Sequence, residues 1–160
     1  MRLFLRVLLV VSLSLGFMAG AQAAVKRQEI APDFQLPDLQ QQVFTLSAYR
    51  DKQPVLLFFW TTWCPYCRRG LKELSERYPK LSEKGWQVLA VNIGEPADKG
   101  KRFVDNYPLQ SKVLLDENLS VANAYDVLGV PTYALIDKSG MLVFKDNYLP
   151  LEQLEGLVLE

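Results

Sequence analysis

Runs of apolar residues mark the strands that the chain is expected to form. The segment "PVLLFFW", residues 54–60, is continuously apolar, which is typical of a strand buried on both faces of a sheet. The segment "WQVLAVNI", residues 86–93, has the same character. Shorter apolar runs predict three further strands, at residues 112–116, 132–137 and 141–148. The polar "KSG" between the last two predicts that they form a hairpin.

Apolar residues that recur every three or four positions predict helices between these strands. This spacing runs from Pro65 to about Tyr78. Pro79 is expected to interrupt that helix near its end, because proline lacks the backbone N–H. Further helices are predicted over residues 101–107, over residues 118–127 and from Pro150 onward.

Two short apolar alternations, residues 34–36 and 43–46, flank the polar turn "DLQQQ". They predict a small β-hairpin, followed by one helical turn near Ser47 to Tyr49. Strands then alternate with helices, and the chain closes on a hairpin and a helix. The sequence therefore predicts an α/β fold, with a central mixed β-sheet flanked by helices and an N-terminal β-hairpin extension.

Residues 1–23 have the three parts of an export signal. Arg2 and Arg6 precede the apolar stretch "VLLVVSLSLGFM". Ala21 and Ala23 form the A-x-A arrangement that signal peptidase favours. The apolar stretch is shorter than the roughly 20 residues that span a bilayer. We therefore expect a signal peptide that is cleaved near Ala23, and an uncleaved anchor in the inner membrane is the alternative.

Residues 24–30 are expected to form a short linker, and residues 31–160 a single folded domain. The chain has 160 residues, of which 49% are hydrophobic and 22% charged, enough for one hydrophobic core. It carries 18 basic and 18 acidic residues, and no basic run follows the first few residues. This balance argues against nucleic acid as a partner.

The two cysteines of the chain, Cys64 and Cys67, lie in "FFWTTWCPYCRRG", directly after the first buried strand. A structural zinc site needs four cysteine or histidine ligands. The chain has no histidine, so such a site would need a second chain. A structural disulfide is the next alternative, but closing so short a loop stabilises a fold by only about 2 kcal/mol. A redox-active pair is the favoured interpretation.

The position of Cys64 supports that interpretation. A strand that ends at Trp63 and a helix that starts at Pro65 place Cys64 at the helix N-terminus, where unpaired N–H groups and the helix dipole stabilise a thiolate. We expect Cys64 to attack a substrate disulfide and the more shielded Cys67, one turn later, to resolve the mixed disulfide. The "RR" that follows either adds positive charge or forms a solvated helix face.

A second motif, "GVPT", lies at residues 129–132, ahead of a predicted strand. A cis Val130–Pro131 bond would turn the chain there and leave the backbone of Val130 free to pair with an extended substrate segment. This signal is weak alone. It gains weight from the cysteine motif, because both are expected at one end of the sheet.

With these motifs, the chain resembles exported thioredoxin-fold proteins of the TlpA/ResA-like group, in the redoxin or AhpC/TSA-like part of the thioredoxin superfamily. The resemblance rests on "APDFQLPDLQQQVFTLSAYRDKQPVLLFFWTTWCPYC", "VLAVNIGE" and "VLLDENLSVANAYDVLGVPTYALIDKSG". It implies a thioredoxin fold and a periplasmic thiol-disulfide oxidoreductase without a cofactor or metal, usually a reductant. Many such proteins serve cytochrome c maturation. The implied partners are protein disulfides such as those of apocytochrome c, with a membrane thiol-disulfide reductase as electron donor to a monomeric protein.

The resemblance also implies roles for individual residues. Cys64 and Cys67 are the redox pair, and Pro131 is the cis-proline beside them. The implied substrate-binding residues surround the pair: Trp63, Pro65, Tyr66, Val130 and Pro131.

Three departures from the family pattern change these expectations. Phe58 stands where thioredoxins have a buried aspartate, and Gly70 stands where many ResA-like proteins have a glutamate, so the usual proton relay is absent. Glu95 is the nearest substitute for this relay, and a solvated loop acid is the alternative for Glu95. The dipeptide Pro65-Tyr66 adds no positive charge between the cysteines. We therefore expect a reduction potential lower than that of the strong periplasmic oxidants.

Other functions stay open from the sequence. A disulfide oxidase or isomerase would use the same chemistry at a different reduction potential. A peroxiredoxin-like peroxidase is disfavoured, because Leu57 stands where peroxiredoxins carry a proline and Trp-Cys-x-x-Cys is not their pattern. A non-enzymatic binding module would keep its partners after a Cys64→Ser substitution, whereas an enzyme would lose turnover.

Overall fold

The computed structural model describes residues 29–107 and 109–156, which form two β-sheets. The central sheet has six strands in the order β1-β8-β7-β4-β5-β6. Their bounds are β1 (Glu29–Ile30), β4 (Val55–Trp60), β5 (Gln87–Ile93), β6 (Lys112–Asp116), β7 (Thr132–Ile136) and β8 (Met141–Asp146). Strands β2 (Gln35–Pro37) and β3 (Val43–Thr45) form the separate antiparallel hairpin that the sequence predicted.

The central sheet is mixed, as expected from the sequence. β4 runs parallel to β5, and β5 runs parallel to β6. β7 is antiparallel to both β4 and β8, and β1 pairs antiparallel with β8. β4, which leads to the cysteines, thus lies inside the sheet between β5 and β7. The predicted α/β architecture is confirmed.

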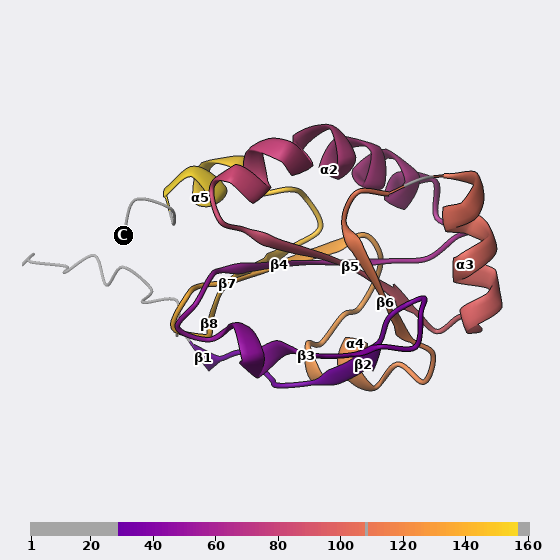
Figure 1. Ribbon diagram of the computed structural model, residues 1–160, viewed down its shortest axis with the longest axis horizontal. Coiled ribbons are helices and arrows are strands. Elements are labelled where there is room, and N and C mark those ends of the chain that lie inside the picture. Colours follow the sequence, from indigo (N-terminus) through magenta and orange to yellow (C-terminus); the bar gives the residue numbers. More distant parts are fainter. Residues whose placement is uncertain (1–28, 108, 157–160) are drawn as a thin grey trace, which may run out of the picture.

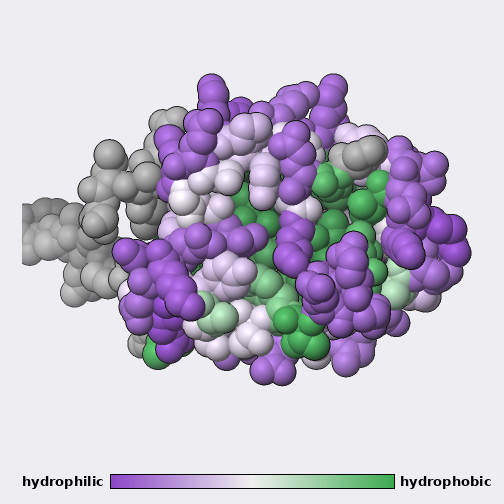
Figure 2. Space-filling view, in the orientation of Figure 1, coloured by the Kyte–Doolittle hydropathy of each residue, from purple (hydrophilic) through white to green (hydrophobic). Residues whose placement is uncertain are grey.

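Helices and the hairpin cover the two faces of this sheet (Figure 1). α2 (Pro65–Glu83) and α5 (Leu151–Gly156) lie on one face, and α4 (Ser120–Ala124) lies with the β2–β3 hairpin on the other. α3 (Ala97–Asn106) lies at the β6 side, and a 3-10 turn, η1 (Leu46–Tyr49), follows the hairpin. In the same orientation, hydrophilic residues cover α2 and α3, and hydrophobic residues show between the layers (Figure 2).

Strand β4 is buried on both faces because its alternate side chains enter two different cores. Leu57 and Phe59 pack in the core under the hairpin and α4, whereas Phe58 and Trp60 pack in the core under α2. All residues of β4 are buried. Burying one such side chain stabilises a fold by about 1.5–3 kcal/mol. The continuous apolar run in the sequence reflects this two-sided burial.

An ion pair between the buried Asp38 and the exposed Lys112 fastens the hairpin to the edge of the central sheet. Asp38 follows β2 and accepts hydrogen bonds from the backbone N–H groups of Gln40 and Gln42. Its Oδ2 lies 2.9 Å from Nζ of Lys112 in β6, and an isolated bridge pairs Asp38 with Leu114. Burial raises the pKa of the Asp38 carboxyl, but the hydrogen bonds and the charge of Lys112 outweigh it and hold the pKa below its ordinary value.

The prediction that Pro79 interrupts its helix is wrong. α2 continues through Pro79 to Glu83. Proline lacks one backbone hydrogen bond of the helix, but Leu74 before it and Leu81 after it are both buried in the core under α2. Packing on both sides of Pro79 therefore outweighs the missing bond.

The bounds of other elements also differ from the predictions. α3 begins at Ala97 rather than at residue 101. α4 is shorter than expected, and Asp116 at the end of β6 fixes its start by accepting hydrogen bonds from the N–H groups of Val121 and Ala122. β1 lies within the segment expected to be a linker. Both residues of β1 are exposed, so no apolar pattern marks this strand.

The predicted export signal, residues 1–23, lies outside the described residues, and so does most of the predicted linker. The part of the predicted last helix beyond residue 156 lies outside them as well. Between residues 29 and 156, leaving out residue 108, no helix is both long enough and apolar enough to cross a membrane.

Candidate redox-active site

Cys64 and Cys67 lie where the chain passes from β4 to α2, and they form a disulfide with a Cα–Cα distance of 5.2 Å. Cys64 is the N-cap of α2, and Pro65 occupies the first position of the helix. Proline suits this position, because its missing N–H would have no partner within the helix. This is the placement of the two cysteines that the sequence predicted.

The start of α2 stabilises negative charge on the sulfur of Cys64. The backbone N–H of Cys67 donates a hydrogen bond to Sγ of Cys64 over 3.1 Å, and the helix dipole acts in the same direction. In the reduced protein these groups favour the Cys64 thiolate, which is the nucleophilic form. In the disulfide, Cys64 is 3% exposed and Cys67 0%, so the expected difference in accessibility is small in the oxidised protein.

The "GVPT" motif meets the cysteines, although 66 residues separate Cys64 from Val130 in sequence. The Val130–Pro131 peptide bond is cis, as expected, and the carbonyl oxygen of Val130 lies 3.7 Å from Sγ of Cys64. Asn147 fastens this loop, because its Nδ2 donates to the carbonyl of Pro131 over 2.6 Å. Sequence reasoning missed Asn147, since nothing local marks a polar residue after the last strand as the partner of a distant loop.

Large hydrophobic side chains are exposed next to both motifs. Trp63 is 64% exposed and Tyr66 65% exposed. Leu128, shortly before the cis-proline, is 100% exposed and was not among the predicted substrate-binding residues. The guanidinium of Arg69 lies 4.5 Å from the centre of the Tyr66 ring. Exposed apolar groups of this kind are typical of surfaces that contact other proteins.

Arg68 does more than form a solvated helix face. Its Nε and Nη2 donate to the carbonyl oxygen of Thr62 over 3.3 and 3.0 Å. Its backbone N–H donates to the carbonyl of Cys64, and its guanidinium lies 5.9 Å from the centre of the Phe103 ring. Arg68 therefore connects the first turns of α2 to the loop that precedes Cys64.

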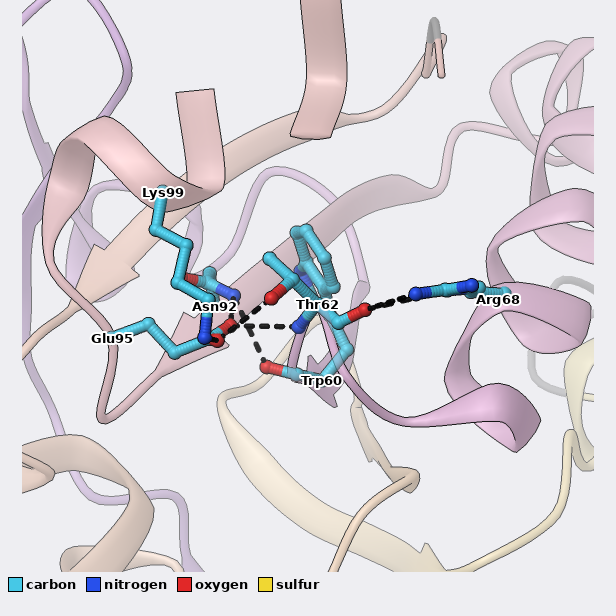
Figure 3. A network of polar contacts seen from close by, with 6 residues as sticks. All are labelled: Trp60, Thr62, Arg68, Asn92, Glu95 and Lys99. Atoms are coloured by element: carbon cyan, nitrogen blue, oxygen red, sulfur yellow. Dashed lines mark hydrogen bonds and ion pairs between the residues drawn. The ribbon is translucent and has the colours of Figure 1, made fainter. Parts of the chain in front are cut away.

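Glu95 is a buried acid with 4% exposure, so the alternative of a solvated loop acid is wrong. Its Oε2 accepts hydrogen bonds from the N–H of Thr62 over 2.7 Å and from Nδ2 of Asn92 over 2.9 Å. Its Oε1 accepts one from Oγ1 of Thr62 over 2.8 Å and pairs with Nζ of Lys99 at 2.6 Å (Figure 3). Burial raises the pKa of Glu95, but these donors outweigh it and hold the pKa below its ordinary value. A proton relay through Glu95 stays a hypothesis.

An aromatic contact fills the space near the two positions where the resemblance would place acids. The rings of Phe58 and Tyr133 have centres 4.7 Å apart. Both pack against Gly70 of α2, where an added Cβ atom would lie 2.5 Å from the hydroxyl oxygen of Tyr133. Burial raises the pKa of the Tyr133 phenol, so this hydroxyl is neutral at physiological pH.

The site offers little to a metal ion. The two cysteines are joined to each other, and the sequence contains no histidine. In the part of the chain that the structure describes, no three Cys, Asp or Glu side chains are grouped so that they could hold a metal ion.

Comparison with known proteins gives one family and a consistent group of relatives. A profile of the AhpC/TSA family matches residues 28–145. The thiol-disulfide oxidoreductase ResA of Geobacillus kaustophilus is 41% identical over 119 residues, which cover 74% of this chain and 68% of the relative. ResA of Geobacillus thermodenitrificans is 38% identical over 139 residues, which cover 84% of this chain and 79% of the relative.

Solved structures share the architecture. A candidate thiol:disulfide interchange protein DsbE from Chlorobium tepidum is 31% identical and superposes with a TM-score of 0.75 over 84% of this chain and 98% of that one. A secreted disulfide oxidoreductase of Mycobacterium tuberculosis shares the fold at 22% identity, with a TM-score of 0.66 over 79% of this chain and 94% of that one. The thioredoxin fold expected from the sequence is thereby confirmed.

Proposed function

The chain belongs to the AhpC/TSA family, among the ResA-like thiol-disulfide oxidoreductases, and we propose that it reduces disulfides of exported proteins through Cys64 and Cys67. One observation carries the proposal: the two sequence motifs meet at a single sulfur atom. Sγ of Cys64 receives the N–H of Cys67 and lies 3.7 Å from the Val130 carbonyl. A stabilised thiolate next to free backbone suits disulfide exchange with a polypeptide.

The reaction starts from the reduced protein. The Cys64 thiolate attacks one sulfur of the substrate disulfide, so that a bond forms between Cys64 and the substrate and the other substrate sulfur leaves as a thiolate, which takes up a proton. Cys67 then loses its proton to water and attacks Sγ of Cys64. The protein disulfide forms, and the second substrate sulfur leaves and is protonated. In total, two protein thiols become a disulfide and the substrate disulfide becomes two thiols.

Substrate binding is assigned to the surface around this sulfur. Trp63 and Tyr66 are exposed apolar groups, and Pro65 lies between Cys64 and Tyr66 in the chain. The carbonyl of Val130, beside Pro131, is placed to accept a hydrogen bond from an extended substrate segment.

The proposed direction is reduction. Pro65 and Tyr66 place no charge between the cysteines, so nothing there stabilises the reduced form strongly. The potential is then expected well below the approximately −120 mV of a strong periplasmic oxidant and nearer the thioredoxin value of about −270 mV. A measured potential above about −150 mV would identify an oxidase instead.

The proposed location is the periplasm, and the export signal that the sequence predicts over residues 1–23 supports it. The protein is either released there by cleavage or held at the inner membrane by an uncleaved anchor. A monomer in the periplasm would receive electrons from a membrane thiol-disulfide reductase. Its proposed substrates include the disulfide of apocytochrome c, which would give it a role in cytochrome c maturation.

The decisive experiment is to trap the mixed disulfide. In a Cys67→Ala variant expressed in the periplasm, the bond between Cys64 and a substrate cannot be resolved, so substrates stay attached and mass spectrometry identifies them. A Cys64→Ser variant is the control, and it should capture nothing and show no turnover. If the wild-type protein instead reacts with hydrogen peroxide faster than with protein disulfides, it is a peroxidase.

A further inference from the structure

The loop that precedes Cys64 is held at Thr62 by two other parts of the molecule. Every polar group of Thr62 is engaged: its N–H and hydroxyl bind Glu95, and its carbonyl binds Arg68. Thr62 lies between these two side chains (Figure 3). The neighbouring Thr61 accepts the N–H of Cys64 over 3.4 Å. A displacement of Thr62 would therefore reach Cys64 within two residues.

We propose that Glu95 is a positioning residue that fixes Cys64 through Thr62, and that it does not carry protons to or from the cysteines. The proposal deepens the function proposed above and rests on it. The resemblance implies a proton-relay acid at the position where this chain has Gly70. The proposal gives the buried acid Glu95 a different task.

The contacts of Glu95 leave no room for a relay. A carboxylate has about four lone-pair positions for hydrogen bonds. Each oxygen of Glu95 already has two partners, with Thr62 and Asn92 on Oε2 and Thr62 and Lys99 on Oε1. A proton on either oxygen would displace one of these donors. The hydrogen bonds that lower the pKa of Glu95 therefore also leave neither oxygen available to take up a proton during the reaction.

The partners of Glu95 make it a rigid support. Asn92 lies in β5, and its Nδ2 is also 3.5 Å from the carbonyl oxygen of Trp60, the last residue of β4. Lys99 lies in the first turn of α3. Glu95 thus links β4, β5 and α3, and Arg68 adds α2 through the Thr62 carbonyl. These four elements hold the loop in place at the N-terminus of α2, where the Cys64 thiolate is stabilised.

Positioning and direct electrostatics predict opposite effects on Cys64. The charged groups next to this loop are Glu95, Lys99 of α3, and Arg68 and Arg69 of α2. If Glu95 acted by its charge, its removal would lower the pKa of the Cys64 thiol, because a nearby negative charge disfavours a thiolate. If Glu95 acts by position, its removal lets Sγ move away from the N–H of Cys67, and the thiol pKa rises.

The test compares Glu95→Gln with wild type, both in a Cys67→Ala background so that Cys64 alone reacts. The amide of glutamine must turn its N–H groups toward two of the four donors that Glu95 binds. Hydrogen bonds that hold Thr62 are therefore lost, while the size and shape of the side chain stay nearly the same. We expect attack of Cys64 on dithiobis(nitrobenzoate) at neutral pH to slow about tenfold. The midpoint of the pH profile for alkylation by iodoacetamide should move to higher pH.

Thr62 variants show whether the effect passes through this residue. Thr62→Ser keeps both bonds to Glu95 and should react like wild type, whereas Thr62→Val loses the hydroxyl bond and should slow the reaction in part. The double variant Glu95→Gln with Thr62→Val should be no slower than Glu95→Gln alone. If Glu95→Gln does not fold, Thr62→Val provides the test without any change of charge, and it should raise the midpoint.

Asp38→Asn is the matched control. Asp38 is also a buried carboxylate with a lysine partner and backbone donors, but it supports the hairpin rather than the Cys64 loop. It should reduce the free energy of unfolding and leave the rate and midpoint of Cys64 unchanged.

The proposal would be overturned if Glu95→Gln reacted at the wild-type rate, or if its midpoint moved to lower pH. It would also be overturned if the double variant Glu95→Gln with Thr62→Val reacted more slowly than Glu95→Gln alone. Equal slowing by Asp38→Asn would have the same consequence. These rates use small reagents. They remain informative if the wild-type protein fails to reduce protein disulfides, which would contradict the proposed function and not the role of Glu95.

Discussion

Phe58 and Gly70 occupy one site between β4 and α2, and a Cβ atom added at Gly70 would lie 2.9 Å from Cζ of Phe58. The hydroxyl oxygen of Tyr133 would be closer still, at 2.5 Å. Cys67 belongs to the same core. Position 70 therefore has room for a hydrogen atom only, and two aromatic rings fill this part of the core instead of a relay acid.

Gly70→Ala is expected to destabilise the fold. Alanine favours a helix over glycine by about 1 kcal/mol, but overpacking a filled core costs about 1–3 kcal/mol, so we expect a net loss of up to about 2 kcal/mol. Denaturant unfolding of the oxidised protein measures this loss. Adding Tyr133→Phe removes the nearest atom and should recover part of it.

Gly129→Ala is the control for that experiment. A Cβ atom at Gly129 would meet nothing within 4 Å, so the free energy of unfolding should hardly change. An equal loss at both glycines would contradict the steric explanation.

Alkylation of the reduced protein should label Cys64 well before Cys67. Cys64 receives the N–H of Cys67 at the start of α2, which favours the thiolate of Cys64, whereas Cys67 lies within the first turn of the helix. Mass spectrometry after brief treatment with iodoacetamide at neutral pH gives the labelling rate of each cysteine. Equal rates would remove the assignment of Cys64 as the nucleophile.

Trp63→Ala should weaken the use of protein substrates more than that of small disulfides. Trp63 is 64% exposed beside Cys64, and a single exposed aromatic anchor can contribute about 1–2 kcal/mol to protein binding, roughly a five- to thirtyfold change in kcat/KM. The rate with dithiobis(nitrobenzoate) should stay within about twofold of wild type. Val43→Ala, at a residue that is 67% exposed on the hairpin, is the control and should change neither rate.

Asp38 should make stability depend on pH in the acid range. Its carboxyl has a pKa below the ordinary 3.8 in the folded protein, so the folded state binds fewer protons than the unfolded state there. The contribution of Asp38 is complete above the ordinary pKa and is lost as the pH falls through the folded-state value. Asp38→Asn should therefore be less stable at neutral pH and lose less stability between about pH 5 and pH 2. Parallel curves for both proteins would refute this role.

Local patterns in the sequence determined most of the helices and strands and the position of the cysteine pair. Leu57 and Phe58 point into different cores. A continuous apolar run indicates such two-sided burial whichever elements pack against the strand. The helix after Cys64 was predictable for a similar reason, because preferences for the N-cap and for Pro65 at the first helical position are set by neighbours in sequence. The cis bond at Pro131 was predicted from its short motif and the second motif upstream.

The tertiary structure alone decided what surrounds the pair. Glu95 reaches Thr62 across 33 residues, and no local pattern separates a buried acid from a solvated one. Pro79 stays within its helix because Leu81 beyond it is buried, which depends on the sheet below. A residue's propensity is a local property, whereas its burial and its hydrogen-bond partners depend on which distant elements pack against it.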